Sequence, residues 1–171
     1  MVGDGGEHAQ GAGVLAGAWL AAVRGGPVAE ELEALYALAS DAIEARGPAC
    51  WASGQCCNFE ATGHRLYVTG LEAAFTIERL ATTDHARPDD TALAAAIARG
   101  GCPFQVANLC GVHAIKPLGC RVYFCDRSAQ TWQHDLSERL LGMIRELHQR
   151  HAIEYRYGEW RQMLAMFTSV P

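Results

Sequence analysis

The feature that most constrains this chain is the confinement of its cysteines to two short segments. The sequence has 171 residues and seven cysteines, three of them within residues 50–57 and four within residues 102–125. Cysteines that pack in a core are spread along helices and strands, because a free thiol behaves there as a small apolar group. These cysteines stand instead beside Gly, Pro, Asn and Ser, which are typical of turns. Thiols gathered in two turn-rich segments indicate ligands of a metal ion.

All seven thiols are therefore predicted metal ligands. They are Cys50, Cys56, Cys57, Cys102, Cys110, Cys120 and Cys125. A zinc–sulfur bond is about 2.3 Å long and the site is tetrahedral, so four sulfurs must converge closely. Gly54 and Gly119 each lie within two residues of a candidate ligand and allow the tight turns that this requires. Lys116 and Arg121 are predicted to lie just behind the ligands, where positive charge lowers thiol pKa values.

Two other interpretations of the cysteines were weighed, a disulfide framework and plain core packing. An odd number of cysteines, an adjacent Cys56-Cys57 pair and the lack of a secretory signal argue against disulfides. Metal binding is favoured over disulfides, and disulfides over core packing. The chain has no Cys-x-x-Cys pair and no ferredoxin spacing. Two adjacent side chains cannot easily bind the same ion. The pair therefore indicates either a site with several metal ions, or a site in which one of the two thiols does not bind metal directly.

Composition and charge limit the class of protein. Half of the residues are hydrophobic and the formal net charge is −5, which disfavours a nucleic-acid or anionic-membrane binder. The apolar run 14–23 is too short to span a bilayer, and acidic rather than basic residues precede it. We therefore expect a cytoplasmic protein whose partner is a metal ion, with no nucleic acid and no membrane. Its protein partner is unknown from sequence.

The hydrophobic pattern predicts a mostly α fold with a short strand, a small β hairpin and irregular cysteine-rich loops on a helical scaffold. Residues 1–12 are Gly-rich and predicted to be a disordered tail, and residues 13–171 one domain. The predicted helices are 14–23, 28–46, 70–80, 91–99, 128–151 and 158–167, with a strand at 65–69, a hairpin at 104–112 and a turn at 116–119. Thr69 and Glu72 form a capping-box pattern.

Two helix faces are predicted in detail. In residues 28–46 the buried stripe is Leu32, Leu35, Leu38, Ala39, Ala42 and Ile43. In residues 128–151 it is Leu136, Leu140, Met143, Ile144 and Leu147. His134, His148 and His151 are expected to face solvent.

The two cysteine segments resemble those of the YkgJ-type cysteine-cluster family. Its first motif, CxxCGxCC, corresponds here to residues 50–57. Its second, a Cys-Pro pair followed by C-x-I/V-Y-x-x-R-P-x-x-C-R-x-Y/F, corresponds to residues 102–103 and 110–123. The resemblance covers residues 50–125, the family-like core, and implies zinc or iron chelation. It does not imply a particular activity.

This chain departs from the family pattern at three positions. Ser53 stands where the family has a cysteine, His113 where Tyr is common, and Lys116 where Arg is common. A hydroxyl is a far poorer ligand than a thiolate, so Ser53 puts the number of ligands in question. His113 lies between two cysteines and is an additional candidate ligand. His64 and His85 are weaker candidates, because a lone histidine is more often structural than a ligand.

The sequence thus favours a protein that chelates iron, including iron in an iron–sulfur cluster, or zinc through its two cysteine segments. The alternative is an iron–sulfur or open-site iron enzyme. A related cysteine pattern occurs in flagellin lysine N-methylase, which extends this alternative to S-adenosylmethionine-dependent methyl transfer or to redox chemistry. The residues leave both open, and they also leave the number of metal sites open.

Overall fold

Long helices frame the structure, and short helices and strands fill the space between them. The computed structural model describes residues 5–170. The longer helices are α1 (Gly5–Val23), α2 (Pro27–Arg46), α4 (Gly70–Arg79), α5 (Asp90–Ala98) and α7 (Gln130–Arg150). The shorter ones are η1 (Gln55–Cys57), α3 (Phe59–Thr62), η2 (Leu80–Thr82), α6 (Leu118–Val122), η3 (Arg127–Ala129) and α8 (Trp160–Ala165). This confirms the prediction of a mostly α fold with short β pieces.

The strands form small antiparallel pairs. β1 (Tyr67–Thr69) pairs with β4 (Tyr157–Glu159), and so joins the middle of the chain to its C-terminal part. β2 (Gln105–Val106) pairs with β3 (Leu109–Cys110) and forms the predicted hairpin. Ala107 and Asn108 form its turn, and both have positive φ angles, of 48° and 63°, as this tight kind of hairpin turn requires.

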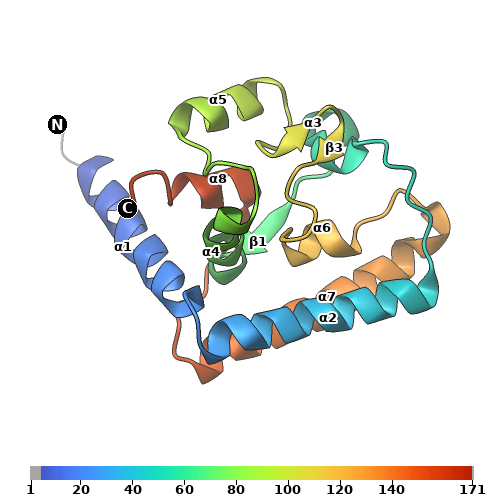
Figure 1. Ribbon diagram of the computed structural model, residues 1–171, viewed down its shortest axis with the longest axis horizontal. Coiled ribbons are helices and arrows are strands. Elements are labelled where there is room, and N and C mark those ends of the chain that lie inside the picture. Colours follow the sequence, from blue (N-terminus) through green and yellow to red (C-terminus); the bar gives the residue numbers. More distant parts are fainter. Residues whose placement is uncertain (1–4, 171) are drawn as a thin grey trace.

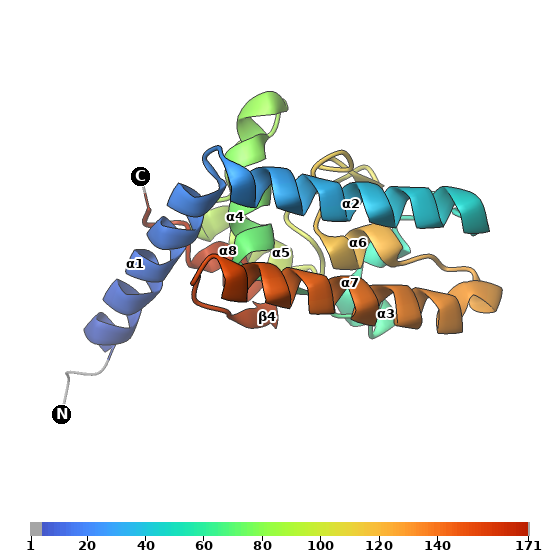
Figure 2. The ribbon, with the colours of Figure 1, turned by 90° about the horizontal axis from the view of Figure 1, so that it is seen from below.

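The helices α2 and α7 lie side by side along one edge of the molecule, and α1 crosses at one end (Figures 1 and 2). The elements α4, β1, α8 and α6 lie over this helix pair, and α3, α5 and β3 lie beyond them (Figure 1). The core lies between these layers. Its largest fully buried side chains include Trp19, Trp160, Phe59, Phe167 and Ile144. Full burial of an aliphatic or aromatic side chain of this size contributes about 1.5–3 kcal/mol.

The helix signals in the sequence have the structure they predicted. Gly47 ends α2 in the left-handed conformation, and its N–H donates to the carbonyl of Ile43. Thr69 and Glu72 form a complete capping box at the start of α4. Asp89 caps α5 by accepting the N–H of Ala92 at 2.7 Å. Most of the predicted α7 stripe is buried, with Met143 partly exposed.

Several predictions were wrong. Residues 5–12 of the predicted disordered tail lie in α1, and residues 1–4 lie outside the described residues. Leu38 is 46 % exposed, because the buried face of α2 runs through Leu32, Leu35, Tyr36 and Ala39, and Leu38 lies away from it. His148 is 1 % exposed, packed edge-on against Tyr155, and does not face solvent. The turn predicted at 116–119 passes into α6 at Leu118.

The C-terminal part also differs from its prediction. Residues 158–167 were predicted as one helix, but residues 157–159 form β4 and the helix α8 covers only Trp160–Ala165. No single helix among residues 5–170 is long and apolar enough to cross a membrane. The bent pair formed by residues 11–23 and Pro27–Arg46 passes that test when the two are taken together, on length and composition alone.

Candidate metal centre

Backbone hydrogen bonds hold the two cysteine segments side by side. The N–H of Cys102 donates to the carbonyl of Cys57 at 2.9 Å. Close by, the N–H of Glu60 donates to the carbonyl of Gly100 at 3.0 Å. The first segment is therefore fastened directly to the start of the second, although more than forty residues of sequence separate Cys57 from Cys102.

Gly54 lets the first segment approach the hairpin closely. Its φ is +70°, and a Cβ at this position would overlap the carbonyl oxygen of Asn108 in the turn between β2 and β3. The Gln105 side-chain N–H donates to the Gly54 carbonyl at 3.1 Å. Since only glycine satisfies both the conformation and the close contact, the residue directly positions η1, which carries Cys56 and Cys57.

The thiols of three other cysteines gather around that of Cys57. Its thiol lies within hydrogen-bonding reach of the thiols of Cys102, Cys110 and Cys56, and its pKa is raised because it is the donor to them. A hydrogen bond from the single S–H of Cys57 can serve one neighbour at a time, and it lowers the pKa of the thiol that accepts it: that of Cys102, that of Cys110 to about 7 or that of Cys56 to about 6. We call these four thiols the Cys57 cluster. The member that accepts this hydrogen bond therefore favours the thiolate form, which is the form that binds metals.

Contact between thiols is a weaker condition than shared coordination of one ion. Among residues 5–170, no three side chains of His, Cys, Asp or Glu are placed as a group that could hold a metal ion. The structure therefore brings predicted ligands together without showing a coordination sphere, and the ligand assignments stay predictions.

The other three thiols lie at different depths. Burial raises the pKa of Cys120, and the negative charges of Cys102 and Cys110 raise it further. Cys120 therefore lies beside the Cys57 cluster. Cys50 is exposed. Cys125 bonds outside the cluster: its thiol donates a hydrogen bond to Gln55 Oε1 at 3.8 Å.

Ser53 lies next to Cys125. Its Oγ is 4.0 Å from the Cys125 sulfur, and it also accepts the N–H of Gln55 at 3.4 Å. The hydroxyl therefore faces a thiol of the other cysteine segment while supporting the turn that leads into η1. A lost ligand position and a hydrogen-bonding role within the turn are both compatible with this place.

A cavity of about 570 Å³ opens over the thiols, and we call it the thiol cavity. Its wall includes five cysteines, Cys50, Cys56, Cys57, Cys110 and Cys120, together with His113, Lys116, Arg121, Tyr123, Ile43 and Leu109. Ligand pockets in proteins typically have volumes of about 300–1,000 Å³. The thiols thus line a space large enough for an ion with additional ligands, or for a small molecule.

His113 and Lys116 form a polar pair on the wall of the thiol cavity. Lys116 Nζ lies 3.0 Å from His113 Nε2. The charge of Lys116 is the main cause that lowers the pKa of His113, so the neutral imidazole accepts from the ammonium group. The same lysine charge helps to lower the pKa values of Cys56 and Cys110. Lys116 therefore lies close enough to favour the thiolate form of these two cysteines, and its place behind the ligands stays a prediction. His113 is exposed beside them.

Arg121 contacts a loop carbonyl. It donates to the carbonyl of Ala114 at 3.0 Å, and its guanidinium lies over the ring of Tyr36 at 4.2 Å from the ring centroid. The Cys120 thiol acts on it through charge. The predicted place behind the ligands is therefore compatible with the structure.

The remaining histidines near the cysteines serve as packing groups. The imidazole of His64 stacks on Tyr123, with ring centroids 3.9 Å apart, and burial lowers its pKa. His85 lies against the Cys110 loop, where a Cβ on Gly111 would overlap its imidazole. Both rings thus lie against the segment that carries Cys110 and Cys120, and neither belongs to a ligand group among the described residues.

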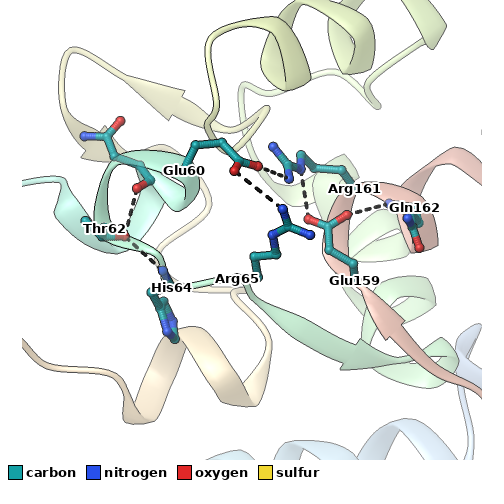
Figure 3. A network of polar contacts seen from close by, with 8 residues as sticks. Glu60, Thr62, His64, Arg65, Glu159, Arg161 and Gln162 are labelled. Atoms are coloured by element: carbon teal, nitrogen blue, oxygen red, sulfur yellow. Dashed lines mark hydrogen bonds and ion pairs between the residues drawn. The ribbon is translucent and has the colours of Figure 1, made fainter.

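A charged network behind α3 supports the first cysteine segment (Figure 3). Glu60 pairs with Arg161 at 3.2 Å and with Arg65 at 3.6 Å, so it links α3 to α8 and to the start of β1. Arg161 also pairs with Glu159 at 2.8 Å, and both side chains are more than nine-tenths buried. Arg161 in addition lies 5.3 Å from the ring centroid of Phe59.

Two contributors to the site were missed by the sequence reasoning. The indole of Trp160 is a hydrogen-bond donor to Cys102 and helps to lower its pKa. Glu72 accepts the backbone N–H of Leu118 at 2.8 Å and so holds the helix that contains Cys120. The capping box identified one use of Glu72, but no local signal indicates a partner 46 residues away. Trp160 carries no signal at all beyond being aromatic.

No family model, curated protein or solved structure matches this chain.

Proposed function

We propose that the chain is a metal-binding protein that chelates iron or zinc through its two cysteine segments. The observation that carries the proposal is the Cys57 cluster, in which thiols from both segments lie in contact. Core packing alone gives no reason for four thiols to meet, whereas a soft metal ion does. The hydrogen bond between Cys102 and the Cys57 carbonyl supports the proposal, because it fixes the segments relative to each other without any ion.

The chemistry of the donor set fits a thiophilic metal. The pKa of Cys56 is lowered to about 6 and that of Cys110 to about 7, and the pKa of Cys102 is lowered as well, so the thiolate form is favoured among these thiols. Lys116 offsets part of the negative charge that several thiolates bring together. The residues predicted to hold the ion are those of the Cys57 cluster first, with Cys120 beside them and Cys50 and Cys125 at the edge. Zinc and iron–sulfur remain two candidates, because thiolate ligands suit both.

The family and the location are parts of the same proposal. The resemblance of residues 50–57 and 102–125 to the YkgJ-type cysteine-cluster motifs supports chelation of zinc or iron. A cytoplasmic location fits free thiols, because a reducing compartment keeps them available to a metal. The cysteines of the described structure are all free, without a disulfide among residues 5–170.

The thiol cavity favours a second candidate, an iron–sulfur or open-site iron enzyme. A structural metal site is closed by protein ligands, whereas a catalytic site keeps a position open to substrate. Here a cavity of about 570 Å³ adjoins the thiols, and Ser53 replaces one family cysteine near Cys125. A methyl-transfer or redox activity would use this opening for its substrate.

Anaerobic purification followed by elemental analysis and a visible spectrum tests the proposal. Iron with acid-labile sulfide and a coloured protein would support a cluster, and colourless protein with zinc would support a zinc site. Cys57→Ser should lose most of the bound metal, because Cys57 contacts three other thiols. Cys50→Ser should lose less, since that side chain is exposed and bonds to no other thiol in the described part of the chain.

Chelation gives a second measurement. Removal of the metal should raise backbone hydrogen exchange mainly in residues 50–57 and 102–125, while α2 and α7 keep their protection, because the helical core does not depend on the site. A folded protein that purifies without metal from media rich in zinc and iron would contradict the proposal. So would equal metal content in Cys57→Ser and the parent protein.

A further inference from the structure

A second cavity lies on the other side of Arg121 from the thiols. It has a volume of about 390 Å³ and is lined by residues of α2, α4 and the loop before α6, among them Tyr36, Ala37, Phe75 and Arg79. We call it the Arg121 cavity. Arg121, Ala114 and Ser40 belong to the walls of both cavities. Arg121 is therefore part of the partition between them.

The charge of Arg121 has no carboxylate partner in the described structure. The guanidinium forms no ion pair among residues 5–170, its hydrogen bond goes to the carbonyl of Ala114, and its Nε is buried without a hydrogen-bond partner. The carboxylate of Glu72 also acts on it through charge, but both oxygens of that group already accept hydrogen bonds, from Thr69 and Leu118. A partly buried cation left in this state costs free energy, which a bound anion would offset.

The remaining walls define what kind of anion fits. Arg79 pairs with Glu33 at the rim, where their side chains are 39 % and 49 % exposed. With Arg121 deeper in the cavity, the formal charge of the lining is +1, which a single negative charge neutralises. Arg79 also lies over the ring of Phe75, 5.2 Å from its centroid. Tyr36, Phe75 and Ile115 give the cavity apolar surfaces beside the charges.

We propose that the Arg121 cavity binds a small monocarboxylate with a flat apolar body. The planar guanidinium of Arg121 matches the planar carboxylate, with Arg79 adding charge at the rim. The apolar body lies beside Ile115 and the parts of the Tyr36 and Phe75 rings that Arg121 and Arg79 do not cover. A phosphate dianion fits less well, because it would carry one charge more than the cavity neutralises and would be repelled by Glu33. The inference does not depend on a metal at the thiols, so it stands or falls separately from the proposed function.

Titration of the purified protein with benzoate tests the proposal, with benzamide as the neutral analogue of the same shape and inorganic phosphate as the dianion. We expect benzoate to bind in the millimolar range and benzamide at least about tenfold more weakly, since it lacks the charge that Arg121 recognises. Calorimetry gives the affinities, and amide chemical shifts give the place of binding. The largest shifts should fall in α2, α4 and residues 114–121.

Variants separate the Arg121 cavity from the rest of the surface. Arg121→Gln should weaken benzoate binding about tenfold or more, and Arg79→Gln by a smaller factor. Arg150→Gln is the matched control, because Arg150 forms the same kind of exposed pair with Glu31 on α2 but lies away from the cavity lining. It should bind benzoate as the parent does.

Ala37→Leu provides a variant that leaves every charge in place. Ala37 is exposed on α2 and lines the cavity, so a larger side chain should fill the space without disturbing the core. We expect about tenfold weaker benzoate binding at an unchanged melting temperature. Should Arg121→Gln fail to fold, this variant and the benzamide comparison still decide the question.

Two outcomes would overturn the proposal. The first is equal affinity for benzoate and benzamide, and the second is benzoate binding that survives Ala37→Leu. If Lys116→Gln loses binding in that second case, the anion lies in the thiol cavity.

Discussion

The carboxylate of Glu72, on α4, accepts the backbone N–H of Leu118, the first residue of α6, at 2.8 Å. Its other oxygen accepts the N–H of Thr69 at 2.9 Å and completes the capping box. One side chain that is 1 % exposed therefore starts one helix and holds the start of another. Because α6 contains Cys120, the position of that thiol depends on a carboxylate that touches no cysteine.

The first prediction concerns this carboxylate. Glu72→Gln replaces one acceptor oxygen by an NH₂ group, which faces a backbone N–H and leaves a buried donor unpaired. We expect a loss of about 1–3 kcal/mol in the free energy of unfolding, measured by urea titration. Increased hydrogen exchange at residues 118–122 should accompany it. Glu78→Gln, at a partly exposed position on the same helix, is the control and should change neither quantity appreciably. Equal effects in the two variants would show that the hydrogen bond from Leu118 to Glu72 contributes no measurable stability.

Local signals predicted the helical scaffold well, for physical reasons that are visible in particular residues. Gly47 readily adopts the left-handed conformation that ends α2. Thr69 and Glu72 accept the free backbone N–H groups of the first turn of α4. Each signal marks a helix end through residues that are close in sequence. The hairpin was likewise predicted from Ala107 and Asn108 between two short apolar pieces. Helix ends and tight hairpins depend on residues that are close in sequence, so a sequence pattern can predict them.

The errors arose where tertiary contacts override the pattern. A histidine at a helix end is usually solvated, but His148 is covered by the turn whose Ile153 carbonyl faces its Nδ1 at 3.4 Å. β4 was missed because its partner β1 lies about ninety residues earlier in the chain. The cysteines of the site were predicted from their clustering. Their mutual contacts, and the roles of Trp160 and Glu72, required the fold.

The second prediction concerns Gly54. Gly54→Ala adds a Cβ that would overlap the Asn108 carbonyl oxygen and also places alanine at a φ of +70°. Gly63→Ala is a matched control, because Gly63 has a φ of +66° but open space around it. We expect about 1 kcal/mol of destabilisation in the control from backbone strain alone, and about 2–4 kcal/mol at Gly54. Urea unfolding measures both, and metal content should fall only in Gly54→Ala. Equal losses of stability would mean that the contact with the hairpin relaxes freely.

The third prediction concerns the charged network behind α3. Arg161→Met leaves the buried carboxylate of Glu159 without its partner, and we expect a loss of about 3 kcal/mol in unfolding free energy. Arg65→Met removes an exposed member of the same network, whose side chain is 57 % exposed, and should cost about 0–1 kcal/mol. Thermal unfolding of the two variants side by side checks the difference. A cost at Arg65 that matches the cost at Arg161 would contradict this ranking.

The fourth prediction is a pH dependence from His148. Burial lowers its pKa below the ordinary value of 6.5, so the unfolded chain takes up the proton first as pH falls. The contribution of the neutral ring is therefore fully present above about pH 6.5 and is lost on acidification through the folded-state pKa. His148→Phe should flatten this part of the stability profile between pH 7 and pH 5, whatever its effect at pH 7. His134→Phe, at an exposed position of α7, should leave the slope unchanged. The measurement is urea unfolding across that range on metal-free protein, and an identical slope in His148→Phe would refute the assignment.

The last prediction concerns Ser53, whose Oγ lies 4.0 Å from the sulfur of Cys125. Ser53→Cys introduces a thiol at a position where the YkgJ-type motif that residues 50–57 resemble has a cysteine, and it places this thiol opposite Cys125. With oxidised glutathione as the oxidant and without metal, we expect the new thiol to cross-link to Cys125, because a mixed disulfide with glutathione on one of the two is attacked by the neighbouring thiolate, which releases reduced glutathione. Peptide mapping by mass spectrometry identifies the pair.

Metal content then distinguishes the two roles of Ser53. If Ser53 occupies a vacant coordination position, Ser53→Cys should hold its metal more tightly against a chelator and should stop binding a small ligand such as cyanide, because the added thiolate closes the site. If Ser53 only supports the turn through Gln55, metal retention should equal that of the parent protein. The double variant Ser53→Cys with Cys125→Ser is the control, since it keeps the new thiol but removes its neighbour. A cross-link to Cys50 or Cys56 in place of Cys125 would contradict the geometry on which both expectations rest.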